Sequence, residues 1–223
     1  MKAKTGFIKP IIMLLPFVGI GLFVLFYTLS ALNYPGGSWN FSNQTGFSFW
    51  HNYLCDLLDD YAINGEVNSA RFFARIALGV LCASLILIWL SLPKLFTIKS
   101  FNLTIMRLAG LLSIIVTLFL ASGTHDFILR IAGIFGAIAI ITCLVELYKI
   151  KYDKLLMLGV FCLLVFLANY FIYETNYYIK ILPVLQKLTF ISFIVWFVFL
   201  DIQVYRKLRF LNENRTANHE GLK

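Results

Sequence analysis

The sequence predicts an all-α membrane protein: a bundle of six transmembrane helices with both chain ends in the cytoplasm and an interfacial amphipathic helix in the first outer loop. Three observations support this prediction. The chain is 60% hydrophobic, it contains six long apolar segments, and its lysines and arginines gather on one side of a six-span arrangement. Only 13% of its 223 residues are charged, about half the share of a typical soluble domain.

Each membrane-spanning helix needs roughly 20 mostly apolar residues, and six segments meet this requirement. The predicted spans are residues 11–32, 72–92, 105–121, 127–148, 155–173 and 188–205. The first apolar run is longer than the roughly 7–15 residues of a signal peptide's apolar region, so we expect it to be retained as a span. All six spans belong to one domain, residues 1–223, with a long outer loop at 33–71 and a cytoplasmic tail at 206–223.

The distribution of basic residues predicts the orientation. In a six-span chain, fourteen basic residues fall on the side of the termini: Lys2, Lys4, Lys9, Lys94, Lys99, Arg107, Lys149, Lys151, Lys154, Arg206, Lys207, Arg209, Arg215 and Lys223. The opposite side has five: Arg71, Arg75, Arg130, Lys180 and Lys187. Because cytoplasmic loops of membrane proteins are enriched in Lys and Arg, both termini are expected inside, in a bacterial cytoplasmic membrane.

The net charge of +8 does not indicate nucleic-acid binding. The cations lie in short clusters between apolar runs, the pattern of a membrane protein, so membrane lipid is the expected partner. No protein partner can be identified. Cys82, Cys143 and Cys162 lie inside apolar runs and only Cys55 lies outside them, so no disulfide framework is expected. The four cysteines form no CxxC pair, which argues against a zinc finger.

The first outer loop contains a segment, residues 47–58, with helical amphipathic spacing. One face has Phe47, Trp50, Leu54, Leu57 and Leu58, and the other has Ser48, His51, Asn52, Cys55, Asp56 and Asp59. The polar face either meets water while the aromatic face anchors in lipid, or lines a pocket over the mouth of the bundle. In the pocket, it would bind a polar ligand or a metal.

Further polar residues are expected at the same outer level. His125 and Asp126 follow the third span and either cap the next helix or act as a base or metal ligand. Arg71 and Arg75 either pair with loop acids or snorkel to headgroups. Alternatively, Arg71, Arg75 and Arg130 together bind an anion, such as a phosphate or a carboxylate, through their guanidinium groups.

Other patterns narrow the possible functions. No clear ionisable residue lies at a span centre, which argues against a proton pump, and the P-loop, GxSxG and HExxH motifs are absent. Near the inner ends of their helices, Glu146 and Asp201 are expected to form local ion pairs with neighbouring basic residues.

Motifs in the first ninety residues resemble a known family. These are Tyr34-Pro-Gly-Gly-Ser38, Gly46-Phe-Ser48, Asn52 with Cys55-Asp-Leu57, and Asn68 with Arg71-Phe-Phe73. They resemble a group of six-span bacterial and archaeal membrane proteins classified as a domain of unknown function, and are more distantly similar to the damage-regulated autophagy modulator group. In that family Ser stands at the position of Cys55. The resemblance implies that Asn52 and Asp56 matter for function.

Two functional hypotheses follow from these patterns. The first is a non-enzymatic protein, without a cofactor, that binds a lipid or small amphiphile or regulates a partner. Its predicted ligand-binding residues are Asn52, Asp56, Arg71, Arg75, His125, Asp126 and Arg130. The alternative is a zinc-dependent lipid hydrolase at the outer leaflet, with His51, Asp56, His125 and Asp126 as metal ligands or base.

Overall fold

The computed structural model describes residues 10–121 and 125–220, with side chains described for residues 11–120 and 126–214. Across these residues the chain is mainly helical, apart from an irregular loop between α1 and α2, and two isolated β-bridges are the only extended pairings. Six helices are long and apolar enough to cross a membrane. The predicted all-α class and the six apolar helices are therefore confirmed, and the chain is a multi-pass membrane protein.

The long helices are separated by short 3₁₀ turns at several points. The α-helices are α1 (Leu15–Leu32), α2 (Arg71–Ser91), α3 (Phe101–Thr117), α4 (His125–Lys149), α5 (Asp153–Thr175) and α6 (Leu182–Glu220). The 3₁₀ helices are η1 (Pro10–Leu14), η2 (Cys55–Leu57), η3 (Leu92–Leu95), η4 (Leu118–Ala121) and η5 (Ile179–Ile181). Helix α3 begins earlier than its predicted span because the Ser100 hydroxyl caps it by accepting a hydrogen bond from the Leu103 amide at 3.3 Å.

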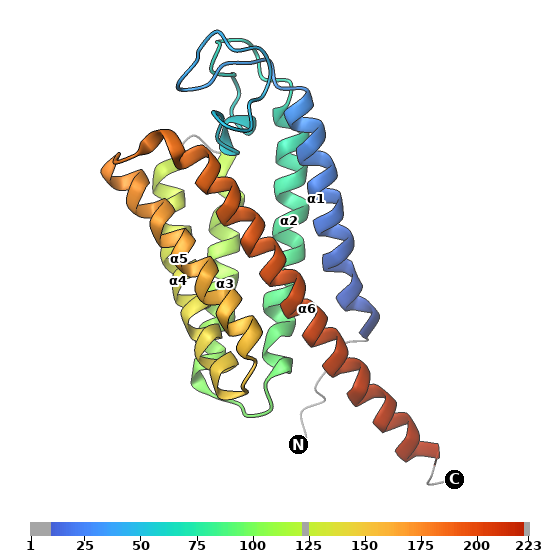
Figure 1. Cartoon of the computed structure of the whole chain (residues 1–223). Helices are drawn as coiled ribbons and strands as arrows, with labels where there is room; N and C mark the ends of the chain where they lie inside the picture. Colours follow the sequence, from blue (N-terminus) through green and yellow to red (C-terminus); the bar gives the residue numbers. More distant parts are fainter. Residues whose placement is uncertain (1–9, 122–124, 221–223) are drawn as a thin grey trace.

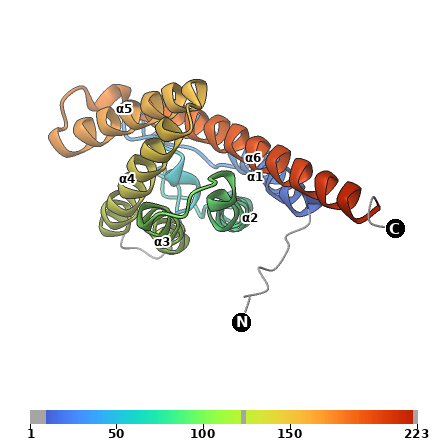
Figure 2. The same ribbon diagram turned by 90° about the horizontal axis from the view of Figure 1, so that it is seen from below.

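Neighbouring helices in the sequence pack in pairs: α1 with α2, α3 with α4, and α5 with α6. Viewed along the bundle, α2, α3, α4 and α5 follow one another around the molecule, while α6 runs across the remaining side (Figure 2). Figure 1 shows α6 crossing the bundle obliquely, with its C-terminal part extending past the other helices. At 1.5 Å per residue, this 39-residue helix is about 58 Å long.

Two glycines leave room for tryptophan rings of neighbouring helices in the core. A Cβ atom at Gly110 of α3 would lie 2.3 Å from the Trp89 ring of α2, so only glycine permits this approach. At Gly159 of α5, a Cβ would lie 2.8 Å from the indole nitrogen of Trp196. That nitrogen donates a hydrogen bond to the Leu155 carbonyl at 3.0 Å, which ties α6 to α5.

The two acids expected to form local ion pairs behave differently. Glu146 accepts hydrogen bonds from Lys149 at 2.7 Å and from Asn102 at 2.8 Å. Asp201, in the middle of α6, is 1% exposed, and neither carboxylate oxygen has a hydrogen-bond partner among the described residues. The expected ion pair of Asp201 is therefore absent from the described part of the chain. Its apolar surroundings disfavour a charge.

Replacing Asp201 with leucine should stabilise the protein, since a buried polar group without a partner costs about 1–3 kcal/mol. We expect Asp201→Leu to raise the thermal unfolding midpoint in detergent, measured by tryptophan fluorescence at pH 8. Asp201→Asn, which keeps the size and a buried polar group, should give a smaller increase. A lower midpoint for Asp201→Leu would show that the acid makes a stabilising interaction.

Candidate functional site

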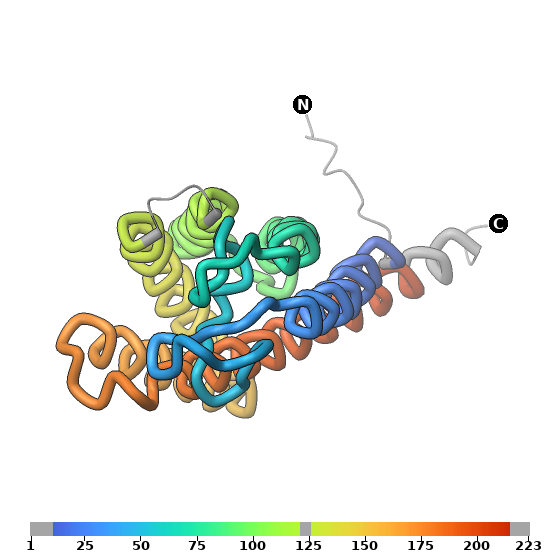
Figure 3. Tube along the Cα trace, turned by 90° about the horizontal axis from the view of Figure 1, so that it is seen from above, coloured from blue at the N-terminus to red at the C-terminus, as the bar shows by residue number. Residues whose placement is uncertain are grey.

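Residues 33–70, called the cap below, form a compact loop between α1 and α2 that covers one end of the bundle (Figure 3). The chain enters the cap through Gly36 and Gly37, whose φ angles of +146° and +85° lie in a region that favours glycine. A Cβ atom at Gly37 would lie 2.5 Å from the backbone nitrogen of Asn64. The two glycines therefore let distant parts of the loop pack against each other.

Asn52 is the centre of the cap's hydrogen-bond network and is fully buried. Its amide nitrogen donates to the Gly37 carbonyl at 2.7 Å and to the Asp56 carboxylate at 3.0 Å. Its side-chain oxygen accepts from the Ser48 amide at 2.9 Å and from Gln44 at 3.1 Å. Because a carboxamide has two donors and two acceptor sites, this side chain has no bonding capacity left for a ligand.

Asp56 lies four residues further along the chain and is 5% exposed. One carboxylate oxygen accepts from the Tyr53 amide at 2.9 Å as well as from Asn52. Burial raises the pKa of the Asp56 carboxyl to about 6, although the hydrogen bonds from Asn52 and Tyr53 oppose this shift. The acid is therefore part of the framework of the cap and is poised to titrate near neutrality.

Asn68 closes the cap on its other side and is also fully buried. Its amide nitrogen lies 2.9–3.3 Å from the carbonyl oxygens of Asp56, Leu57 and Asp59, and its oxygen accepts from the Ala70 amide at 3.1 Å. These bonds satisfy the carbonyls of Asp56 and Leu57 in the η2 turn and that of Asp59 just after it. Asn68 therefore joins the middle of the cap to the start of α2.

Helix α6 holds the cap through Lys187, which is 3% exposed. The ammonium group donates to the Asn52 backbone carbonyl at 2.6 Å and to the Pro183 carbonyl at 3.0 Å. It also lies 5.6 Å and 5.1 Å from the ring centroids of Phe47 and Phe49. Carbonyl oxygens and aromatic faces both stabilise a cation, so this lysine can be buried without a direct carboxylate partner.

Leu54 is fixed by two helices at once. Its amide donates to Gln186 of α6 at 2.8 Å, and its carbonyl accepts from the Tyr27 hydroxyl of α1 at 2.6 Å. The cap is therefore attached to the first and the last helices of the bundle.

The amphipathic helix predicted for residues 47–58 is wrong: this segment forms turns and the single 3₁₀ turn η2. Side chains explain the difference. Asn52 accepts from the Ser48 amide and Asp56 accepts from the Tyr53 amide, and such local bonds compete with helical pairing. The residues of the predicted polar face do not share one surface: Asn52 and Asp56 are buried inside the cap, whereas His51 lines a groove at its surface.

The three predicted anion-binding arginines have acidic partners and do not form one cluster. Arg71 and Arg75 contact the same carboxylate oxygen of Asp60 at 3.0 and 2.9 Å. Arg75 also donates to the Leu58 carbonyl at 2.9 Å. Arg130 instead pairs with Glu174 of α5 at 2.9 Å. Of the two interpretations of Arg71 and Arg75, this geometry favours ion pairing.

The predicted metal ligands are only partly within the described side chains. The side chain of His125 lies outside them, and Asp126 forms a hydrogen bond with Tyr173. Over the side chains that the structure describes, no group of three or more His, Cys, Asp and Glu residues is placed to hold a metal ion. Burial also raises the pKa of the Cys55 thiol to about 12, which disfavours the thiolate that a metal requires.

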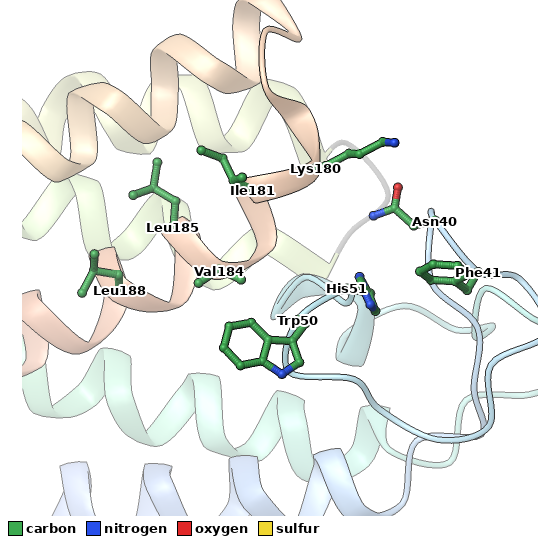
Figure 4. A pocket seen from close by; sticks show the side chains of 9 residues that line it. All are labelled: Asn40, Phe41, Trp50, His51, Lys180, Ile181, Val184, Leu185 and Leu188. Atoms are coloured by element: carbon green, nitrogen blue, oxygen red, sulfur yellow. The ribbon is translucent and has the colours of Figure 1, made fainter.

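A groove of about 720 Å³ lies between the cap and the start of α6 (Figure 4). Its lining residues are Asn40, Phe41, Trp50, His51, Lys180, Ile181, Val184, Leu185 and Leu188. In Figure 4 the aliphatic side chains of α6 lie on one side, and Trp50, His51 and Phe41 of the cap face them across the groove. Lys180 extends toward the end where Asn40 lies.

A more polar hollow of about 620 Å³ adjoins the groove. The two share Asn40, Phe41 and His51, and the hollow adds Ser42, Asn43 and Gln44. The combined site is apolar along α6 and polar over the cap.

Sequence reasoning missed the residues that organise this site. The sequence marks Lys187 only as an exception to the charge asymmetry and Asn68 only as part of the motif that carries the family resemblance, and nothing in it singles out Gln44 or Gln186. The one usable signal was Lys187 itself, since a basic residue on the cation-poor side, next to an apolar run, needs a specific partner. Comparison with protein-family models, curated proteins and solved structures finds no match to this chain. The resemblance seen in residues 34–73 stays a prediction.

Removing the Lys187 ammonium should loosen the cap. Lys187→Met keeps the chain length but leaves the Asn52 carbonyl buried without its donor, which costs about 1–3 kcal/mol. We expect faster hydrogen–deuterium exchange in residues 47–56. The matched control is Lys154→Met, because Lys154 is exposed at the start of α5 and lines neither the groove nor the cap. Equal exchange in both variants would show that Lys187 does not hold the cap.

The cap should become less stable as the pH rises from about 4 to 6. The pKa of Asp56 is raised from 3.8 to about 6, so its stabilising contribution is fully present below pH 3.8 and is lost as pH rises through the folded-state pKa. Exchange protection of the cap amides, corrected for intrinsic rates, should fall by roughly thirtyfold between pH 4 and 6, because a shift of about two pKa units corresponds to roughly a hundredfold in total. Asp56→Asn should abolish this dependence, and an unchanged pH profile in that variant would contradict the assignment.

Proposed function

We propose that the protein binds a membrane amphiphile, a lipid with an apolar chain and a polar headgroup, in the groove between the cap and α6. The observation that carries this proposal is the change in the lining from aliphatic side chains on α6 to polar side chains on the cap. A groove that is apolar at one side and polar at the other complements a lipid with an apolar chain and a polar headgroup. The groove's volume is also within the roughly 300–1,000 Å³ of typical ligand pockets.

The apolar part of the groove suits an acyl chain. Val184 and Leu185 lie four and three residues before Leu188, so both share a face of α6 with Leu188. Leu188 is 46% exposed and Trp50 is 62% exposed, which leaves apolar surface for a ligand to cover. An acyl chain leaving the surrounding bilayer would therefore exchange one apolar environment for another.

Exposed aromatic side chains support a position of the cap at the membrane surface. Trp39, Phe41 and Trp50 are 74%, 55% and 62% exposed, and aromatic rings of this kind favour the boundary between hydrocarbon and headgroups. At that depth the polar side of the groove would lie among the headgroups. A lipid could then enter sideways from its own leaflet.

The proposed leaflet is the outer one. The excess of basic residues on the side of the termini supports N-in and C-in orientation, which would place the cap on the non-cytoplasmic face. In this proposal, Asn52 and Asp56 shape the groove from inside the cap. The observations on the described residues provide no support for the alternative zinc-dependent hydrolase.

Filling the groove should displace the lipid. Val184→Trp adds a large ring to the apolar wall, and overpacking of about 1–3 kcal/mol corresponds to an occupancy about tenfold lower. Native mass spectrometry of the detergent-purified protein would count the retained lipid molecules. The control is Ile191→Trp on the same helix, because Ile191 is 54% exposed and does not line the groove.

Three results would bear on the proposal. A retained lipid in the parent protein and in Ile191→Trp, with loss in Val184→Trp, would support it. No retained lipid in the parent protein would overturn it, and so would equal occupancy in the two tryptophan variants.

A further inference from the structure

We infer that the bound lipid has an anionic headgroup that also bears hydroxyl groups, as in a phosphodiester of glycerol or another polyol. This inference rests on the proposed function and specifies its ligand. It comes from the side chains at the polar end of the groove. These side chains include one unpaired cation and several neutral groups that make no hydrogen bonds with the described residues.

The positive charge comes from Lys180 of η5. Among the described residues that line the groove or the adjoining hollow, it is the only one with a full charge. The residue is exposed, and it forms no hydrogen bond or ion pair with the residues that the structure describes. Figure 4 shows its side chain running toward Asn40, at the polar end. One such ammonium group complements one phosphodiester charge, and charge-assisted bonds are about twice as strong as neutral ones.

The neutral polar groups come from the cap. Asn40 lines both cavities, and Ser42 and Asn43 line the hollow. The side chains of these three residues make no hydrogen bonds within the described chain, in contrast to Asn52 and Asn68, which are fully engaged in the cap. A carboxamide both donates and accepts, as a hydroxyl group does, so amides and polyol hydroxyls pair in either direction.

The rings of Phe41 and His51 lie where the apolar groove meets the polar hollow. The Phe41 and His51 rings meet edge-on, with centroids 4.8 Å apart, and both residues line both cavities. His51 is partly exposed, and an imidazole ring always has at least one N–H donor. The phosphate would therefore lie between Lys180 and His51, with the headgroup's hydroxyls toward Asn40 and Asn43.

The experiment compares three lipids that share the same acyl chains: phosphatidylglycerol, which is anionic with hydroxyls; phosphatidylmethanol, which is anionic without them; and phosphatidylcholine. Native mass spectrometry of the full chain in mixed micelles would give the occupancy by each lipid. We expect the occupancy by phosphatidylglycerol to exceed that by either of the other two.

Two variants separate the contributions of charge and hydroxyls. Lys180→Gln should reduce the preference for phosphatidylglycerol over phosphatidylcholine by about tenfold, and the same change at exposed Lys154, at the start of α5, should leave it unchanged. The double variant Asn40→Ala, Asn43→Ala should reduce the preference over phosphatidylmethanol by about fivefold.

The outcomes distinguish the two proposals. If none of the three lipids is retained, the proposed function itself fails. If all are retained equally, or if Lys180→Gln keeps the full preference, lipid binding stands and the headgroup assignment is overturned. A preference that depends on Lys180 but is equal for phosphatidylglycerol and phosphatidylmethanol overturns the hydroxyl part.

Discussion

The buried ammonium group of Lys187 is the interaction on which the cap depends. A charge taken out of water destabilises a fold unless protein groups replace its hydration. Here the Asn52 carbonyl at 2.6 Å, the Pro183 carbonyl at 3.0 Å and two phenylalanine rings do so. The bond to Asn52 matters most for the architecture, because Asn52 also connects to Gly37, Ser48, Gln44 and Asp56 through its side chain. One contact with α6 therefore positions the whole network.

The groove follows from the same contact. Trp50 and His51 directly precede Asn52, and Val184 and Leu188 lie three residues before and one residue after Lys187. When the Lys187 ammonium holds the Asn52 carbonyl, the aromatic residues of the cap are placed opposite the aliphatic wall of α6, as Figure 4 shows. The second attachment, between Leu54 and Gln186 at 2.8 Å, limits rotation of the cap about the first.

Among the side chains of helix α6 that the structure describes, two buried ones, Lys187 and Asp201, are ionisable and have different surroundings. Lys187 is surrounded by acceptors at the cap end, whereas Asp201 is buried at mid-helix without a hydrogen-bond partner in the described chain. The same helix contacts η1, η3, α2 and α5. It is therefore both the attachment site of the cap and the element that closes the open side of the bundle.

The sequence by itself determined the class of the protein. Six long apolar segments can be satisfied only as helices in lipid, because each helix pairs its own backbone groups. This requirement is local, so it is readable from composition and length. Asn52 and Asp56 were also recognised as important, but as ligand-binding residues on a helical face. Only the tertiary structure placed them inside an irregular loop, where their side chains bond to nearby groups of the cap and the backbone carbonyl of Asn52 accepts a hydrogen bond from α6. Contacts between residues 52 and 187 or 54 and 186 join segments more than 130 positions apart, and no periodicity in either segment encodes such a pairing. Tertiary packing alone therefore decided where the groove lies and which side chains remain available to a ligand.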